Sequence, residues 1–244
     1  VAENGDFLAS DLNGFGWHGA MNYQGFMRPL WNWINQNSSI GGGFQGLPFE
    51  MPKIGGKSLV ASMVQFSSSI PWRSLVASMV LLDSHDTARM RTVVNGDKKA
   101  HLSAVTAMLT YPGVPSIFAG DEIGLEGSWG EDSRRTINWE DRSGWDHEFL
   151  AEVKKLVHLR RNHDGLIEGG LRWVAVEDNF ICYLRESEKQ SLLVFISRKA
   201  VRTEIDLADY GYKVSKTLYG PEATGGSIKI DAEYATQGIW EVKG

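Results

Sequence analysis

The chain has 244 residues, of which 42% are hydrophobic and 23% charged, and its formal net charge is −5. These values are ordinary for a globular protein and exclude a largely disordered chain. The acidic balance and the lack of any Lys/Arg-rich run argue against nucleic acid or an anionic membrane as partner. No apolar stretch approaches the roughly 20 residues that a transmembrane helix needs. Cys182 is the single cysteine, so no disulfide can form within the chain, and we expect it to be a buried strand thiol.

The first residues read as the end of a strand followed by a loop. Val1 and Ala2 are apolar, and a turn follows them, as if the strand began elsewhere; this is a first hint of a fragment. Residues 4–20 are rich in Gly, Asn and Asp and predict a loop. A short strand at 20–23 and a helix at 25–34, with apolar residues at helical spacing, come next. The breaker-rich stretch after that helix, residues 35–56, predicts an irregular loop.

The middle of the chain alternates helical patterns with short apolar runs. Helices are predicted at 58–66, 98–109 and 148–161 from the spacing of apolar residues. The runs at 74–82 and 114–119 read as strands buried on both faces, and the first ends in the polar residues of the sequence DSHD. This alternation indicates parallel βα units that display polar residues at the carboxyl ends of their strands.

A heptapeptide occurs twice in this region. The sequence SLVASMV spans residues 58–64 and again 74–80. Two copies fall short of a repeat architecture. We expect a helix in the first copy and a strand in the second, because tertiary context overrides the local propensity of a short sequence.

After Gly169 and Gly170 the pattern changes to short alternating runs separated by turns, which predict an antiparallel β-domain. These runs are residues 171–176, 180–185, 192–197, 201–207, 228–230 and 239–242. We place two domains at 1–167 and 168–244. The first has room for about three parallel strands, whereas a closed eight-stranded barrel takes about 250 residues.

Four segments carry a recognisable order of motifs. They are GWHGAMNY at 16–23, LLDSHDTAR at 81–89, GVPSIFAGDEIGL at 113–125 and GEDSRRTINW at 130–139. A His-Asp pair alone is a weak signal, and taken by itself it is better explained by a surface turn. Together, the segments resemble strands six, seven and eight and the following loop of the α-amylase superfamily, nearest to its α-glucosidase and maltodextrin-hydrolase members. The family usually ends the last motif in Pro-Trp, where this chain has Asn-Trp.

The resemblance implies a fold and an activity. Residues 1–167 would be the second half of a (β/α)8 TIM barrel, from the end of strand five to helix eight, and residues 168–244 an antiparallel β-sandwich, domain C. The implied activity is that of a retaining α-glycoside hydrolase acting on malto-oligosaccharides or related glucosides. We expect no cofactor and no metal in this chain, although some family members bind calcium, and we expect a cytoplasmic location. Linkage and the choice between hydrolysis and glucosyl transfer are left open.

Three residues are candidates for the catalytic centre. Retaining glycosidases use two carboxyl groups about 5 Å apart, and the acid/base must hold its proton near neutral pH, which a neighbouring carboxylate favours. By the resemblance, Glu3 is the acid/base after strand five, and Asp86 is the acid after strand seven that binds sugar hydroxyls and helps distort the ring. His85 would bind the sugar in the central subsite. The alternative for Glu3 is a frayed terminal carboxylate.

The family's nucleophile motif, Gly-x-Arg-x-Asp, has no match in the sequence, nor has its strand-three motif. By the family order the nucleophile would precede Val1, so we expect the chain alone to be inactive. The expected partners are an α-glucan or malto-oligosaccharide and either a missing N-terminal half-barrel or a second copy, since a half-barrel exposes strand edges. The alternatives are a non-catalytic carbohydrate-binding or assembly subunit and a truncated product without a role of its own.

Other residues near the motifs are weaker candidates. Asp132 and Arg134 could bind sugar hydroxyls at the mouth of the site, or form a solvated loop pair. Trp17 could stack on a sugar ring or pack in the core. For Arg89 we expect structural ion pairs, and for the Asp121-Glu122 pair we expect hydrogen bonds that support the loop.

Overall fold

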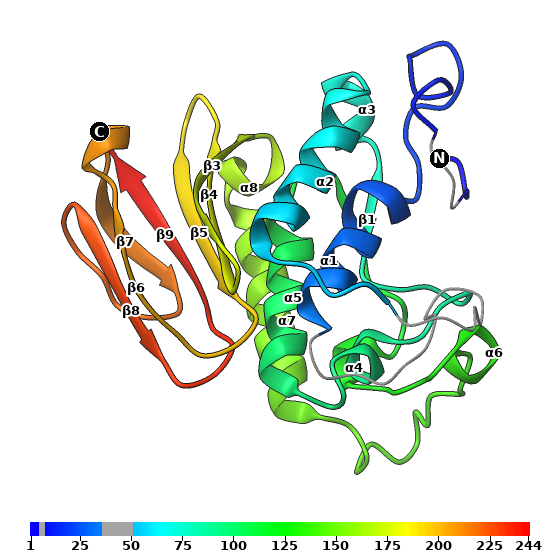
Figure 1. The fold of residues 1–244 in the computed structure, drawn as a ribbon. Helices are drawn as coiled ribbons and strands as arrows, with labels where there is room; N and C mark the ends of the chain where they lie inside the picture. Colours follow the sequence, from blue (N-terminus) through cyan, green and yellow to red (C-terminus); the bar gives the residue numbers. More distant parts are fainter. Residues whose placement is uncertain (5–7, 36–50) are drawn as a thin grey trace.

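The structure is a computed structural model that describes residues 1–4, 8–35 and 51–244 (Figure 1). The helices are η1 (Tyr23–Met27, a π-helix), α1 (Arg28–Ile34), α2 (Gly56–Ser68), α3 (Trp72–Val76), α4 (Met90–Val93), α5 (Lys98–Thr110), η2 (Asp121–Ile123), α6 (Gly130–Ser133), α7 (His147–Asn162), α8 (Asp164–Ile167) and η3 (Ala208–Tyr210). The strands are β1 (Met79–Leu81), β2 (Val114–Ser116), β3 (Gly170–Glu177), β4 (Phe180–Glu186), β5 (Ser191–Ser197), β6 (Val201–Asp206), β7 (Lys213–Tyr219), β8 (Ser227–Ala232) and β9 (Gln237–Lys243).

A ladder of short parallel segments runs through the first part of the chain. Ala2 bridges Ala20, and Met21 bridges Met79, both in parallel. Met79 begins β1, which pairs in parallel with β2. The ladder therefore has four members in chain order, and their carboxyl ends lie on one side, which is the arrangement of consecutive strands in a parallel barrel.

The predicted strand at 74–82 is wrong over its first half. Residues 72–76 form α3, which starts after Pro71, and the strand is confined to β1. The Ser78 hydroxyl donates to the carbonyl of Ser74, which closes this helical turn. The first copy of the heptapeptide is helical throughout in α2, whereas the second divides between α3 and β1. Contacts with the ladder, and not the local sequence, decide the conformation of the second copy.

The long helices were predicted correctly, and their ends have physical causes. Asp97 caps α5 by accepting from the backbone N–H groups of Lys99 and Ala100, and Asp146 caps α7. Every residue of α5 from Ala100 to Thr110 is buried, because the helix lies between the parallel strands and the C-terminal sheet (Figure 1). Residues 36–50 of the expected loop lie outside the described residues.

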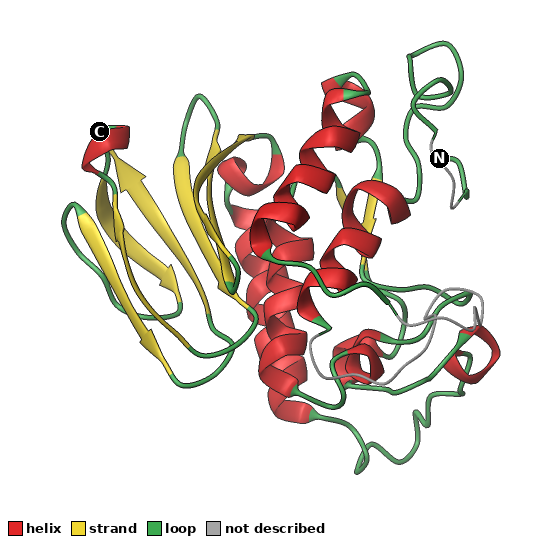
Figure 2. Cartoon of the chain, in the orientation of Figure 1, coloured by secondary structure: helices red, strands yellow, loops and turns green. Residues whose placement is uncertain are grey.

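The C-terminal part is all-β, as predicted (Figure 2). Five antiparallel strands form a sheet in the order β3-β4-β5-β9-β7, and β6 pairs with β8. Strand β4 is buried on both faces: Tyr183 faces the core shared with the helices, and Cys182 faces the core between the two sheets. The cysteine is thus a buried strand thiol, as expected, and burial raises its pKa.

The two parts are joined by buried polar contacts. Arg185 of β4 donates to the carbonyls of Thr110 at the end of α5 and of Gly169. Arg198 donates to the carbonyl of Trp33 at the end of α1. Helix α8 ends at Ile167 and β3 begins at Gly170, so the division at 167/168, which we retain as a proposal, falls between these elements. Among the helices in the described part of the chain, none combines the length and apolar character needed to cross a bilayer.

Candidate active site

The carboxyl ends of the ladder bring three polar side chains together. Glu3 follows the bridge at Ala2, while His85 and Asp86 follow β1. The imidazole Nε2 of His85 lies 3.9 Å from Oε1 of Glu3 and 3.3 Å from Oδ1 of Asp86. One oxygen of each carboxylate and the imidazole nitrogen all lie within 4.8 Å of one another. The three side chains are 58%, 48% and 33% exposed, in the order Glu3, His85, Asp86, so a ligand could reach them from solvent.

A short hydrogen-bonded turn holds Asp86 in place. The backbone N–H of Ser84 donates to the Thr87 hydroxyl at 2.9 Å, and the N–H of Asp86 donates to the Ser84 hydroxyl at 3.2 Å. From η1, Tyr23 donates its hydroxyl to the same Ser84 oxygen at 2.9 Å. Burial raises the pKa of Tyr23, so its phenol remains a donor at neutral pH. The segment after β1 is therefore tied to the segment that follows the second member of the ladder.

Arg134 is the cation of this cluster. Its Nη2 lies 3.4 Å from Oδ1 of Asp86 and 3.6 Å from Oε1 of Glu131. Its Nε donates to the carbonyl oxygen of His85 at 3.1 Å. The structure thus brings Arg134 next to two of the three candidate residues, where its guanidinium offsets the negative charge of the carboxylates. A role in binding sugar hydroxyls stays a prediction.

Asp132 is engaged within its own loop. Its carboxylate pairs with Arg135, with Oδ1 2.8 Å from Nη2, and accepts from the backbone N–H of Ser128 at 2.7 Å. The Ser128 hydrogen bond, followed by Arg135, lowers the pKa of Asp132 to about 2. None of the contacts found among the described residues joins Asp132 to the cluster of Glu3, His85 and Asp86. Asp132 therefore pairs with Arg135 and not with Arg134, its partner in the loop-pair alternative, and sugar binding by Asp132 stays a prediction.

Two tryptophans in the segments that carry the motifs are exposed. Trp17 is 52% exposed and Trp129 is 49% exposed, so packing in the core does not explain Trp17. Trp129 precedes Gly130, whose backbone lies against Asp86: a Cβ on Gly130 would meet the Asp86 carbonyl carbon at 3.2 Å. Sugar stacking by Trp17 stays a prediction.

The same grouping must be considered as a metal site. Two carboxylates and an imidazole could hold a divalent cation. Calcium, however, takes about six to eight oxygen ligands, and Asp86 already faces the guanidinium of Arg134. The donor set among the described residues therefore does not fit calcium.

A buried charged network lies behind the site. Arg89 pairs with Asp121 at 2.7 Å, as expected for a structural ion pair, and Glu122 supports the loop by accepting from the N–H of Gly120. Sequence reasoning missed Asp83, which is buried and accepts from the N–H of Met90 at 2.6 Å. Oδ1 of Asp83 is buried and has no hydrogen-bond partner among the described residues. We infer that Asp83 and Asp121 share a proton, which would remove this deficit. Burial raises the pKa of both carboxyls, that of Asp121 well above its usual value.

Asp121→Asn is expected to change how stability depends on pH. The unfolded aspartates ionise near pH 4, about their ordinary pKa. Because the folded pKa is raised, wild-type stability is highest below that pH and falls as pH rises toward the folded pKa, by up to about 1.4 kcal/mol per pH unit. The Asn variant keeps a donor and an acceptor but has no proton to lose. In urea unfolding between about pH 4 and pH 8, the free energy of unfolding of the Asn variant should therefore rise relative to that of the wild type as pH increases.

The control for this series is Asp209→Asn, which alters an exposed carboxyl. The free energy of unfolding of Asp209→Asn should change with pH in the same way as that of the wild type. A parallel curve for Asp121→Asn as well would contradict the shared proton.

The comparisons with known proteins agree with this geometry. The family profile described as "Alpha amylase, catalytic domain" matches residues 20–141, which is 122 of the 244 residues. The chain belongs to the α-amylase family. The match includes β1, β2 and the segments that carry His85, Asp86 and Arg134. The family resemblance found in the sequence is thereby confirmed.

Relatives of this α-amylase family chain align with about half of its residues. A cyclomaltodextrinase from Bacillus sp. is 38% identical over 119 residues, which are 48% of this chain and 21% of that protein. An intracellular maltogenic amylase from Bacillus subtilis is 33% identical over 132 residues, 53% of this chain and 22% of that protein. The chain thus spans about a fifth of the length of these relatives.

A solved structure confirms the fold. The native debranching enzyme of Nostoc punctiforme superimposes with a TM-score of 0.83 at 23% identity, covering 98% of this chain and 51% of that one. The predicted fold class, half of a TIM barrel followed by an antiparallel domain, is confirmed by this likeness and by the strand order. The residue roles at the site are not decided by it.

Proposed function

We propose that this chain is the acid/base-bearing half of a retaining α-glycoside hydrolase. The observation that carries the proposal is the cluster of Glu3, His85 and Asp86 at the carboxyl ends of the parallel ladder, in a chain of the α-amylase family. Glu3 donates a proton to the leaving oxygen, and Asp86 and His85 hold the hydroxyls of the sugar ring. The remaining half of the barrel supplies the carboxylate that forms the glycosyl intermediate.

The proposed substrates are malto-oligosaccharides and cyclic maltodextrins. Relatives named cyclomaltodextrinase and maltogenic amylase support this substrate class. The name of the intracellular maltogenic amylase likewise supports the proposal of a location inside the cell. A carboxylate pair with an imidazole and a guanidinium suits a ligand with many hydroxyl groups, because each of these groups forms charge-assisted hydrogen bonds.

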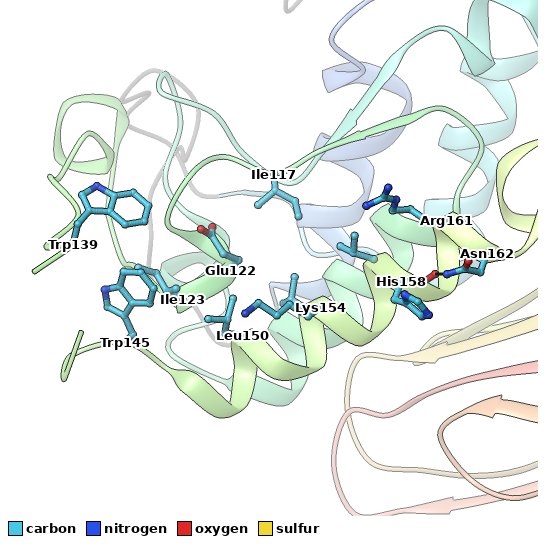
Figure 3. A pocket seen from close by; sticks show the side chains of 12 residues that line it. Ile117, Glu122, Ile123, Trp139, Trp145, Leu150, Lys154, His158, Arg161 and Asn162 are labelled. Atoms are coloured by element: carbon cyan, nitrogen blue, oxygen red, sulfur yellow. Dashed lines mark hydrogen bonds between the residues drawn. The ribbon is translucent and has the colours of Figure 1, made fainter. Parts of the chain in front are cut away.

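The outer edge of β2, which has no strand partner among the described residues, is the proposed docking site for the rest of the barrel. Val114 of β2 is 52% exposed, and Ile117 just beyond it is 37% exposed. Beside them lies a groove of about 740 Å³ between the β2 end and α7 (Figure 3). The residues of α7 that line the groove recur at helical spacing; they are Leu150, Val153, Lys154, Val157, His158, Arg161 and Asn162. In the described part of the chain the basic side of this stripe is exposed at Lys154, His158 and Arg161, Leu150 and Val157 are half-buried, and Val153 is buried.

The groove favours a partner that brings both a strand and a helix. A parallel strand would extend the ladder past β2, and its helix would cover the stripe on α7. A second copy fits less well: its free edge is at Ala2, and residues 8–19, which follow that edge, are turns and bends without a helix. Lys154 and Arg161 at the groove predict acidic residues on the partner helix. We therefore favour the N-terminal half-barrel over self-association.

Sugar release separates the proposal from its alternative. Release from maltotriose and from a cyclic maltodextrin is measured for this chain alone and after an N-terminal half-barrel is added. The proposal expects turnover only in the mixture. Turnover by the chain alone would contradict the assignment of the nucleophile to the other half. Sugar binding without turnover in both samples would favour the non-catalytic carbohydrate-binding subunit.

Reversing the charge of the groove should weaken assembly. The double variant Lys154→Glu, Arg161→Glu is expected to raise the Kd for the N-terminal half at least about tenfold, because like charges would then face each other. The control, Lys199→Glu with Lys213→Glu, makes the same charge change at exposed positions of the β-domain. Sedimentation of each double variant mixed with the N-terminal half measures the two Kd values. Equal binding by the two double variants would place the interface elsewhere.

A further inference from the structure

We propose that Arg89 is a positioning residue, which fixes the loop that carries His85 and Asp86 against the loop that carries Arg134. The loops are residues 83–89 and 118–134. Any effect of this contact on catalysis rests on the proposed function, whereas the contact itself is independent of that proposal. Arg89 touches no part of the candidate cluster and acts through the backbone of its own loop.

The guanidinium of Arg89 makes three separate contacts with the second loop. Nη1 pairs with Oδ1 of Asp121 at 2.7 Å, Nη2 donates to the carbonyl of Ala119 at 3.0 Å, and Nε donates to the carbonyl of Ser133 at 2.9 Å. Ala119 lies shortly after β2, and Ser133 immediately precedes Arg134. One side chain therefore ties the beginning and the end of the second loop to the first.

Further contacts between the two loops extend this attachment to the neighbourhood of Asp86. The backbone N–H of Arg89 donates to the carbonyl of Gly127 at 2.9 Å. The Ser133 hydroxyl donates to the carbonyl of Thr87, the residue after Asp86. Gly130 lies so close to Asp86 that a Cβ there would meet its backbone within 3.4 Å at three atoms. The separation of Asp86 and Arg134 is thus set by how closely the two loops pack.

The chemistry of the site explains why an arginine stands here. The side chain is 2% exposed, and its guanidinium lies 4.0 Å from the centroid of the Phe118 ring. A planar fork with five N–H donors satisfies an aspartate and two carbonyls at once, whereas an ammonium group is a point charge that cannot reach all three. Asp121 offsets the buried charge, so the network is close to neutral when the Asp83–Asp121 pair holds one proton.

The test uses the chain itself and needs no substrate. Amide hydrogen exchange is measured for residues 83–89 and 127–134 in Arg89→Met and Arg89→Lys, together with the NMR signals of the His85 ring. We expect the exchange rates in both loops to rise about tenfold or more in Arg89→Met. In this variant the three contacts are absent, so the loops can open locally without having to break them. We also expect the His85 signals to shift. In Arg89→Lys we expect the loop near Ser133 to be released while the contact with Asp121 persists.

The matched control is Arg160→Met. Arg160 is also buried and donates to backbone carbonyls, those of Leu109, Tyr111 and Gly113, but it does not join the two loops. The Arg160→Met variant should lower the free energy of unfolding of the whole chain without a selective rise of amide exchange at residues 83–89. Equal exchange in the Arg89 and Arg160 variants would overturn the proposal. If Arg89→Met does not fold, the comparison of Arg89→Lys with Arg160→Met decides. Failure of the proposed function would instead appear as absent turnover with both loops protected.

Discussion

In the assembled enzyme, Glu3→Gln is expected to lower kcat for maltotriose by about 10²–10⁴-fold, the range that a lost general acid costs. The substitution keeps the size of the side chain and removes the proton that the leaving oxygen needs. A substrate with a fluoride leaving group needs no such proton. In a single turnover, release of fluoride from α-glucosyl fluoride should therefore be affected far less than cleavage of maltotriose, and this first-turnover comparison isolates the acid step from the later step in which the same residue acts as base.

The matched control for this prediction is Glu131→Gln. Glu131 is an exposed carboxylate 3.6 Å from Arg134, on the same face as the cluster, but it is not one of the three grouped side chains. It should change kcat by no more than a few-fold, about the effect of one exposed ion pair. Equal losses on maltotriose and on the fluoride would mean that Glu3 does not act as the acid.

Arg185→Met is expected to cause the largest loss of stability, about 3 kcal/mol or more. The Arg185 side chain is fully buried and donates to the carbonyls of Thr110, Gly169 and Gly170. Methionine would fill most of the volume but leave these acceptors without partners, at about 1–3 kcal/mol for each buried group. The three carbonyls come from α5 and from the junction with β3, so the helices and the sheet would lose their attachment. Urea unfolding measures the change.

Arg172→Met is the comparison for that loss. Arg172 pairs with Glu186 at 2.6 Å but its side chain is 45% exposed. Solvent screens such a pair, and its removal should cost less than about 1 kcal/mol. Similar losses for the two arginine variants would show that the carbonyl contacts of Arg185 do not hold the parts together.

The sequence indicated where His85 and Asp86 lie in the fold, while the roles assigned to them came from the family resemblance. A buried apolar run followed by His85 and Asp86 is visible in the sequence because strand burial and its polar end are adjacent in the chain. The proximity of Glu3 came from the family order, since nothing in the residues around it indicates which strand it follows. The structure then places it 3.9 Å from His85.

Other features depended on contacts that are distant in sequence. The pairing of Arg134 with Asp86 joins residues 48 positions apart. The raised pKa values of Asp83 and Asp121 follow from the burial of the two carboxyls next to each other, which the sequence does not indicate. Strand β7 was missed because most of its residues are exposed or half-buried and show no clear alternation. The short helix α3 was missed because its residues also suit a strand.

In the proposed division of the active site, this chain supplies the acid/base and sugar-holding residues and the other half of the barrel supplies the nucleophile. Trapping the glycosyl intermediate tests it most directly. The assembled halves are treated with a 5-fluoro-α-glucosyl fluoride, and the mass of each polypeptide is determined. We predict one added glycosyl group on the N-terminal half and none on this chain. A glycosyl group attached to Glu3 or Asp86 would contradict the account.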